Sequence, residues 1–288
     1  MQFRKITIVG VGLLGGSIGL AARKFRIAGE IAGYVRREKT AAECKKFGAT
    51  DYATTDLAAA VSKADLVILC TPLAQMSALV KQFLPALKRG AIVTDVGSVK
   101  ADVVRELDSI IAKSGAYFVG SHPMAGGEKT GVAAARSDLF QEAVCVLTPT
   151  PKSHAGAIRK LERFWKSMGA RVVKLPPEKH DRFVSRTSHL PHVVASALAN
   201  LVLGPAQPKD QSQLCANGFR DTTRVASGSP EMWRDIALAN RKHLAGALDA
   251  FVSELQGFQK ILKEAKPERV EQFFESARDR RDRWRSAK

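Results

Sequence analysis

Short apolar runs alternate with longer amphipathic stretches over the first 175 residues of the chain. The apolar runs are brief and rich in β-branched residues, which is typical of buried strands. They lie at residues 6–9, 31–35, 64–72, 91–95, 117–119, 144–148 and 171–175. Between them, residues 74–87, 101–114 and 155–168 carry apolar positions at helical spacing. Because strand and helix alternate, we predict a parallel sheet with crossover helices.

The first predicted strand runs into the sequence Gly10-Val11-Gly12-Leu13-Leu14-Gly15, and a helix of small residues follows it. This is the G-x-G-x-x-G fingerprint in the strand–turn–helix context that dinucleotide binding requires. Gly10 permits the tight turn, Gly12 lets the backbone approach a pyrophosphate, and Gly15 lets helix and strand pack closely. We expect the cofactor to contact Gly10, Gly12, Leu13, Leu14 and Gly15, together with Thr71 and Pro72, which end the strand at 64–72.

The second predicted strand ends in Arg36-Arg37, with no acidic residue between Ile31 and Arg37. NAD sites commonly carry an acid at this point to bind the ribose 2′-hydroxyl. A guanidinium suits a 2′-phosphate instead, both as a charge and as a bidentate donor. We therefore expect Arg36 and Arg37 to bind the cofactor and favour NADP, with NAD and two solvated arginines as the alternative.

After Pro176-Pro177 the pattern changes to long helical stretches without a convincing strand. We therefore expect an α/β protein with an N-terminal Rossmann-type parallel-sheet domain at residues 1–175. An all-helical C-terminal domain at residues 176–288 follows it. We expect this helical domain to complete the active site against the sheet edge and to pair two subunits into a homodimer.

The formal net charge of +17 is large, but the basic residues are spread along the chain. The most arginine-rich part, residues 278–285, is interleaved with acids and is typical of a solvated helix or tail. The sequence has no zinc-finger or RNP-type motif and no apolar run long enough to span a bilayer. We therefore expect a small anionic ligand as the partner, and neither nucleic acid nor membrane.

The four cysteines are far apart and form no CxxC pair, which argues against a zinc site and a disulfide framework. The N-terminus enters strand pattern almost at once and lacks the features of a signal peptide. These observations favour the reducing cytoplasm.

Polar side chains follow the predicted strands where a bound nicotinamide would lie. Ser98 is on the loop after strand 91–95, and His122 is on a loop with a proline and four glycines, residues 120–131. A helix presents Asp181, Ser185, Ser188 and His192 on one face, and Pro191 is expected to kink it. Arg220 and Arg224, also at helical spacing, could clamp a carboxylate. Each feature taken alone is also compatible with a structural role.

Several of these segments form an ordered series: G-V-G-L-L-G-G-S-I-G at 10–19, D-V-G-S-V-K at 95–100, G-S-H-P-M-A-G at 120–126, H-D-R-F-V-S-R-T-S-H-L-P-H at 180–192, F-R-D-T-T-R-V-A at 219–226, and Met232-Trp233. Across most of its length the chain resembles the prephenate/arogenate dehydrogenases of tyrosine biosynthesis. The first segment is shared by many dehydrogenases, whereas the others, in this order and spacing, are specific.

The resemblance implies oxidative decarboxylation of prephenate and/or arogenate, with hydride transfer to NADP or NAD. It implies that His122 is catalytic and takes the proton of the ring hydroxyl, and that Ser98 orients His122 or that hydroxyl. The substrate-binding residues that it implies are Arg224, Ser188, His189, His192, Glu128, Trp233 and Thr130. Arg224 corresponds to the arginine that binds the substrate carboxylate.

Prephenate and arogenate differ only in the side chain, which carries a keto group in prephenate and an amine in arogenate. Asp181, beside His180, could pair with the ammonium of arogenate, or could be an acid at the start of a helix. We expect prephenate or use of both substrates.

Two other functions use the same architecture. A β-hydroxyacid- or imine-type dehydrogenase usually relies on a lysine in its helical domain, whereas this chain presents Ser188, His189 and His192 there. A non-catalytic NADP-binding sensor would keep the glycine fingerprint but would not need Ser98, His122 and Arg224 together.

Overall fold

The computed structural model describes residues 1–127 and 129–286, which divide into two compact units, one that ends at Asn240 and one that begins at Arg241. The predicted domain boundary after residue 175 falls inside the first unit, and it stays a prediction.

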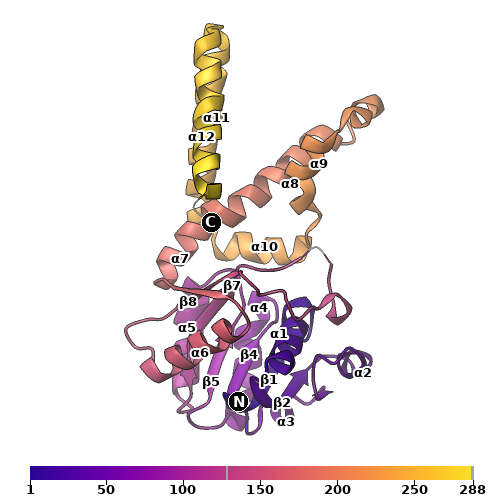
Figure 1. The fold of residues 1–288 in the computed structure, drawn as a ribbon, viewed down its shortest axis with the longest axis vertical. Coiled ribbons are helices and arrows are strands. Elements are labelled where there is room, and N and C mark those ends of the chain that lie inside the picture. Colours follow the sequence, from indigo (N-terminus) through magenta and orange to yellow (C-terminus); the bar gives the residue numbers. More distant parts are fainter. Residues whose placement is uncertain (128, 287–288) are drawn as a thin grey trace. The chain divides into compact units, whose positions relative to one another are not determined.

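A six-stranded parallel sheet is the centre of the first unit, with the strand order β3-β2-β1-β4-β5-β6 (Figure 1). This order is that of a doubly wound dinucleotide-binding fold, and it reverses direction between β1 and β4. The strands are β1 (Phe3–Val9), β2 (Ala28–Tyr34), β3 (Tyr52–Thr54), β4 (Leu66–Leu69), β5 (Ile92–Asp95) and β6 (Tyr117–Phe118). The helices between them are α1 (Leu13–Lys24), α2 (Glu38–Lys46), α3 (Leu57–Val61), α4 (Leu73–Phe83) and α5 (Ala101–Ala112). The Rossmann-type prediction is confirmed.

Both faces of this sheet are covered, which explains why its strands are continuously apolar. Successive residues of a strand point to opposite faces, so Ile68 packs with the helices α1 and α2 and Leu69 packs with α3, α4 and α5. The first of these two cores also receives the aromatic face of α6 (Ala155–Ser167), through Phe164 and Trp165.

A second sheet departs from the predicted alternation. It contains β7 (Gly120–Pro123), β8 (Val144–Thr148) and β9 (Arg171–Lys174), and β7 runs antiparallel to β8. His122 therefore lies in a strand, opposite Val146, and its prediction as a loop residue was wrong. The apolar pattern of a short run shows that a strand is buried but not which neighbour it pairs with.

A buried ion pair joins the two sheets. The Asp95 carboxylate, at the end of β5, pairs with the ammonium of Lys100, and both side chains have no exposed surface. Lys100 Nζ also donates to the Ser121 carbonyl at 2.9 Å, and Asp95 accepts from the Ser121 N–H at 3.3 Å. Asp95 accepts from the Gly97 N–H at 2.8 Å as well. The pair thus fixes the loop that carries Ser98 to the strand that carries His122.

The remainder of the first unit is helical. Its helices are α7 (Pro177–Val184), α8 (Leu190–Leu203), α9 (Asn217–Thr223) and α10 (Pro230–Ala239). A π-helical turn, η3 (Ser185–His189), connects α7 to α8, where a kink caused by Pro191 was expected. Pro191 has no N–H to donate within the helix, and the Thr187 hydroxyl donates to the Phe183 carbonyl at 3.1 Å inside the widened turn.

The second unit is a pair of helices, α11 (Arg241–Glu264) and α12 (Pro267–Ser286), which lie side by side (Figure 1). Phe258 on α11 contacts Phe273 and Phe274 on α12, with ring centroids 4.5 and 5.6 Å apart. Several large apolar side chains of this unit stay about half exposed: Val252, Leu255, Leu262, Phe274 and Trp284. Among the described residues, no helix is long and apolar enough to cross a bilayer.

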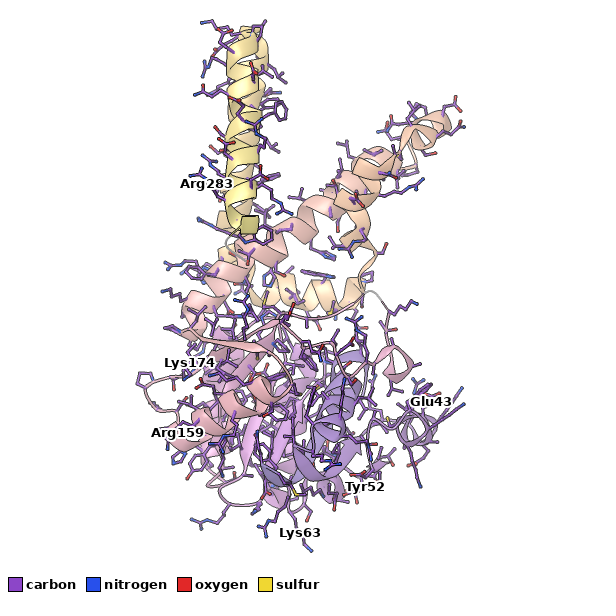
Figure 2. The ribbon with its side chains drawn as sticks, in the orientation of Figure 1. Glu43, Tyr52, Lys63, Arg159, Lys174 and Arg283 are labelled. Carbon is purple, nitrogen blue, oxygen red and sulfur yellow. The ribbon has the colours of Figure 1, made fainter. Side chains whose placement is uncertain are left out.

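Figure 2 labels three basic side chains in different parts of the first unit: Lys63 in the loop between α3 and β4, Arg159 in α6 and Lys174 in β9. The positive charge is therefore distributed over the protein, as the sequence indicates.

The buried ion pair gives a stability prediction. Replacing Lys100 with Met leaves the Asp95 charge buried without its partner, which is expected to reduce the free energy of unfolding by about 3–5 kcal/mol. Denaturant unfolding measures this difference. The double variant D95N/K100M removes both charges and should be more stable than K100M alone. An unchanged unfolding midpoint for K100M would contradict this account.

Candidate active site

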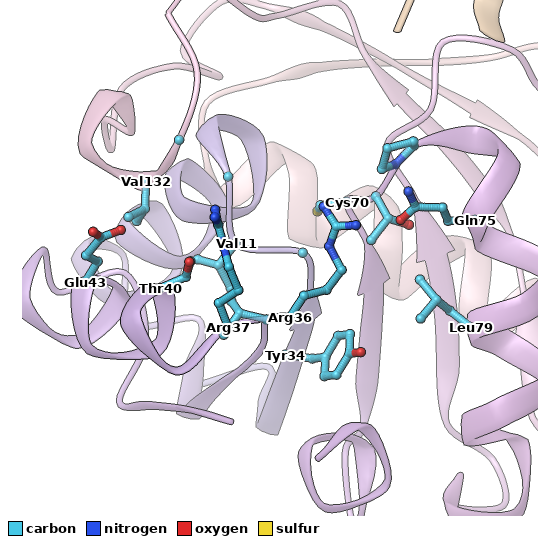
Figure 3. Close-up of a pocket in the computed structure, with 16 residues that line it drawn as sticks. Val11, Tyr34, Arg36, Arg37, Thr40, Glu43, Cys70, Gln75, Leu79 and Val132 are labelled. Carbon is cyan, nitrogen blue, oxygen red and sulfur yellow. The ribbon is translucent and has the colours of Figure 1, made fainter. Parts of the chain in front are cut away.

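A pocket of about 300 Å³ opens where the strand order reverses, between the carboxyl ends of β1, β2 and β4 (Figure 3). Ligands of open α/β sheets bind at this point. Its lining consists of the residues Gly10, Val11, Gly12, Tyr34, Val35, Arg36, Arg37, Thr40, Glu43, Cys70, Thr71, Pro72, Gln75, Leu79, Gly131 and Val132.

The glycine fingerprint shapes the floor of this pocket. Gly10 has a φ of +96°, and a Cβ there would lie 2.8 Å from the Cys70 carbonyl oxygen. A Cβ on Gly15 would lie 2.2 Å from the Gly10 carbonyl oxygen, so α1 can pack this closely on the turn only with glycine. Gly12 has no atom within 4 Å of where its Cβ would be, which leaves room for a ligand beside the backbone.

Two further observations fit a dinucleotide. Arg36 and Arg37 are exposed at the end of β2, and Figure 3 shows Arg36 extending into the space between Tyr34 and Cys70. The Thr71 hydroxyl is buried and has no hydrogen-bond partner among the residues that the structure describes. A pocket with an unpartnered hydroxyl and two guanidinium groups suits a ligand that brings hydroxyls and phosphates.

Some of the predicted cofactor residues line the pocket, and others lie beneath it or in the adjoining helix. Gly10, Gly12, Arg36, Arg37, Thr71 and Pro72 line the pocket. Leu13 and Leu14 instead form the first turn of α1 and pack against the core, and Gly15 is buried beneath the turn. Leu13 and Leu14 would therefore meet a ligand through their backbone N–H groups rather than their side chains.

The second part of the site surrounds His122. The residue is only 6% exposed, and its Nδ1 lies 2.8 Å from Nε2 of His180, which is fully buried in α7. Ser98 is partly buried in the loop between β5 and α5. The imidazole of His189, from the turn η3, is close enough to influence the charge of His122.

The carboxylate of Asp181, next to His180, already has hydrogen-bond partners within the protein. It accepts from the backbone N–H groups of Lys100 and Ala101 at 2.8 Å each, at the N-terminus of α5, and from Nδ1 of His180 at 2.7 Å. The idea that Asp181 could pair with a substrate ammonium is therefore wrong. Asp181 does bind the N-terminus of a helix, but that helix is α5, whereas Asp181 itself lies in α7.

The helices α8 and α10 form the next wall. His192 stacks on Trp233 with ring centroids 3.5 Å apart, and His189 meets the same indole edge-on at 6.1 Å. The Asn240 amide donates to the Asp181 carbonyl at 2.9 Å and to Nδ1 of His189 at 3.1 Å. Among the described residues, Nε2 of His189 is buried without a hydrogen bond of regular geometry, although a hydrogen bond to the Ser98 backbone opposes the lowering of the His189 pKa by burial.

The other predicted substrate residues are more peripheral. Ser188 is partly buried in η3, and Arg224 is exposed at the start of a 3₁₀ turn that packs along α8. Thr130 is exposed beside Gly131, which lines the dinucleotide pocket. Glu128 lies outside the described residues.

Burial keeps these imidazoles neutral. It lowers the pKa of His122 well below its ordinary value, and the nearby His180, Lys100 and His189 lower it further. Burial also lowers the pKa of His189 to about 4, despite the opposing effect of Asp181, and lowers the pKa of His192. A neutral His122 can accept a proton near pH 7.

Two family models match the chain. The nucleotide-binding domain of prephenate dehydrogenase matches residues 18–174, and its dimerization domain matches residues 176–276. The chain belongs to the prephenate dehydrogenase family. The resemblance inferred from the sequence is thereby confirmed.

Relatives within the family match most of the chain. A prephenate dehydrogenase of Bacillus subtilis is 35% identical over 96% of this chain and 75% of that protein. A cyclohexadienyl dehydrogenase of Zymomonas mobilis is 35% identical over 88% of this chain and 87% of that protein. A crystal structure of prephenate dehydrogenase from A. aeolicus, in complex with hydroxyphenyl propionate and NAD+, is 33% identical with a TM-score of 0.90, covering 97% of this chain and 98% of that one.

Within this member of the prephenate dehydrogenase family, sequence reasoning missed the contacts behind His122. His180 was recognised only as part of a segment, and Lys100 and Asn240 received no role. The pair His180-Asp181 was visible as an adjacent acid and imidazole, but nothing in the sequence predicted that His180 would reach a residue 58 positions earlier.

Proposed function

We propose that this protein catalyses the oxidative decarboxylation of prephenate and/or arogenate, with hydride transfer to NADP or NAD, in tyrosine biosynthesis. The observation that carries the proposal is the buried, neutral imidazole of His122, which lies in a protein of this family beside a pocket suited to a dinucleotide. The reaction needs such a base, because a ring hydroxyl must give up its proton as its carbon becomes a carbonyl.

The residues of the chain act on the proton and on the position of the substrate. The nicotinamide, when bound, supplies the acceptor for the hydride that leaves the carbon bearing the hydroxyl. His122 takes the hydroxyl proton, and Ser98 orients the hydroxyl or the imidazole. The bond to the ring carboxylate then breaks, its electrons complete the aromatic ring as CO2 departs, and His122 returns the proton to the phenolate oxygen.

Binding of the substrate is assigned to the surrounding polar wall. Arg224 binds the carboxylate of the side chain as a guanidinium–carboxylate pair. Ser188, His189, His192 and Trp233 line the substrate pocket, with His189 and His192 both in ring contact with Trp233. Glu128 and Thr130 stay proposals for the entrance.

Prephenate, or use of both substrates, is favoured over arogenate alone. Asp181 does not supply the acid that an ammonium needs, because its carboxylate is already used by two backbone N–H groups and a buried imidazole.

We further propose a homodimer that works in the cytoplasm. The half-exposed apolar side chains of α11 and α12 support association through the helical part, the region that the dimerization-domain model largely covers. The four free cysteines are compatible with a reducing compartment.

The proposal is tested by initial rates of nicotinamide reduction, with prephenate and arogenate each assayed against NADP and NAD. Turnover with either substrate is expected, and the variant His122→Asn should lose about 10²- to 10⁴-fold in kcat while still binding cofactor. Cofactor binding without turnover in all four combinations would favour a sensor or another dehydrogenase instead. Full activity of His122→Asn would refute the assigned base.

The cofactor preference is tested at the end of β2. Replacing both Arg36 and Arg37 with Ala should lower kcat/KM for NADP by about 10- to 100-fold, because a charged hydrogen bond contributes about 1.5–3 kcal/mol. The kcat/KM for NAD should change little. Lys39→Ala, which alters a nearby exposed cation that does not line the pocket, is the matched control. Robust wild-type activity with NAD and none with NADP would contradict the preference.

The acid limb of the pH profile reports on His122. Only the neutral imidazole accepts a proton, so activity is lost as pH falls through the pKa of His122. Because burial lowers that pKa below 6.5, kcat/KM should stay level through pH 6.5 and fall only at lower pH. A limb with its midpoint above 6.5 in kcat/KM measurements would show that a different group titrates.

A further inference from the structure

His180 has no part in the function proposed so far, yet it is fully buried against the catalytic imidazole. Its Nε2 lies 2.8 Å from Nδ1 of His122, and its Nδ1 lies 2.7 Å from Oδ1 of Asp181. The rings of the two histidines cross at 71° with centroids 5.0 Å apart, so they meet through their nitrogen atoms rather than by stacking.

His122, His180 and Asp181 thus form a hydrogen-bonded series. The positions of its hydrogen atoms can be assigned by starting from Asp181. The carboxylate of Asp181 accepts two backbone N–H bonds at the positive end of α5, an environment that stabilises a carboxylate as an anion. An ionised carboxylate only accepts, so the hydrogen of a neutral His180 must be on Nδ1. Nε2 of His180 is then an acceptor, and Nδ1 of His122 must donate to it. The lone pair of His122 is left on Nε2.

We infer that His180, oriented by Asp181, is a positioning residue that fixes His122 in the tautomer whose Nε2 is unprotonated. The inference rests on the proposed function, because only a base needs that lone pair. A wrong tautomer would present an N–H to the substrate hydroxyl, and it would do so without any change in the fold.

The same series accommodates the charge that forms during the reaction. When Nε2 of His122 takes a proton, Nδ1–H continues to donate to His180, and the Asp181 carboxylate lies at the other end. His180, Lys100 and His189 face the same imidazole and oppose its protonation, while Asp95 pairs with Lys100. The Asp181 carboxylate, which His122 reaches through the hydrogen bonds of His180, is the group that offsets part of this unfavourable environment for the imidazolium.

The series is not a route for protons to solvent. Asp181 is 1% exposed, and both of its carboxylate oxygens are held by backbone N–H groups. The proton thus stays on His122 until it returns to the product oxygen.

Two substitutions separate positioning from packing. His180→Gln keeps an acceptor that can reach Nδ1 of His122, whereas His180→Leu fills similar space without one. We expect kcat of His180→Leu to fall by about 10²-fold, less than the roughly 10⁴-fold loss that a wrong tautomer causes in the serine protease triad. The glutamine variant should retain most of kcat, and KM should change little in both. His154→Asn, which replaces an exposed helix-capping imidazole remote from His122, is the control with unchanged kcat.

A spectroscopic readout reports the tautomer directly. With ¹⁵N-labelled histidine the chain contains six imidazoles, so the signals of His122 and His180 can be assigned by single replacement. At neutral pH, His122 should carry its hydrogen on Nδ1 in the wild type and in His180→Gln, and on Nε2 or on both in His180→Leu. Thermal unfolding and cofactor binding check that each variant is folded. If His180→Leu does not fold, the tautomer and kcat of His180→Gln still test the inference.

The outcomes are distinct. Equal loss of kcat in both folded variants, with His122 unchanged in tautomer, would overturn the positioning role. A wild-type His122 with its hydrogen on Nε2 would overturn it outright. Absence of turnover in the wild-type protein would remove the proposed function, whereas the tautomer measurement would still show whether His180 controls His122.

Discussion

A lysine without any exposed surface joins the three segments from which the active site is built. The ammonium of Lys100 binds Asp95 at the end of the fifth strand and the carbonyl next to His122, while its backbone N–H binds Asp181 on the first helix of the helical part. Burial of a charge is expensive unless a partner and hydrogen bonds compensate for it. Here the partner and the hydrogen bonds come from the segments that must be aligned in the active site. The contacts that stabilise the buried charge are therefore the contacts that set the geometry of the site.

The electrostatic surroundings of His122 serve two opposing needs. Burial and the neighbouring Lys100 keep the imidazole neutral, which a base requires before the reaction. The same surroundings would disfavour an imidazolium formed in the proposed reaction, and the Asp181 carboxylate at the end of the hydrogen bonds through His180 would moderate this effect. The positive charge spread over the surface would attract a small anionic substrate and a nicotinamide cofactor at long range, an effect that raises the rate of encounter more than the specificity.

Local features of the structure could be predicted from the sequence, and long-range ones could not. The glycine fingerprint and the apolar runs act over a few residues, so the Rossmann-type sheet and the turn at Gly10 followed from them. The direction of the strand that contains His122 depends on Val144 to Thr148, which lie beyond a long loop, and no local pattern encodes it. Family motifs predict His122 and Trp233 as site residues, but the contact between His122 and His180 exists only once two distant segments have folded together.

The π-helical turn has a consequence for how this region tolerates change in length. A π turn holds one more residue than an α-helical turn, and each residue of an α-helix advances its direction by about 100°. The extra residue is taken up inside the wide turn Ser185–His189, so the helix before it and the helix after it keep their alignment. A change of one residue in the regular helix between this turn and His192 has no such outlet, and it would turn His192 by about 100° away from the indole on which it stacks. The stacking of His192 on Trp233 therefore depends on the number of residues that separate His192 from the turn, and not only on the identity of the two side chains.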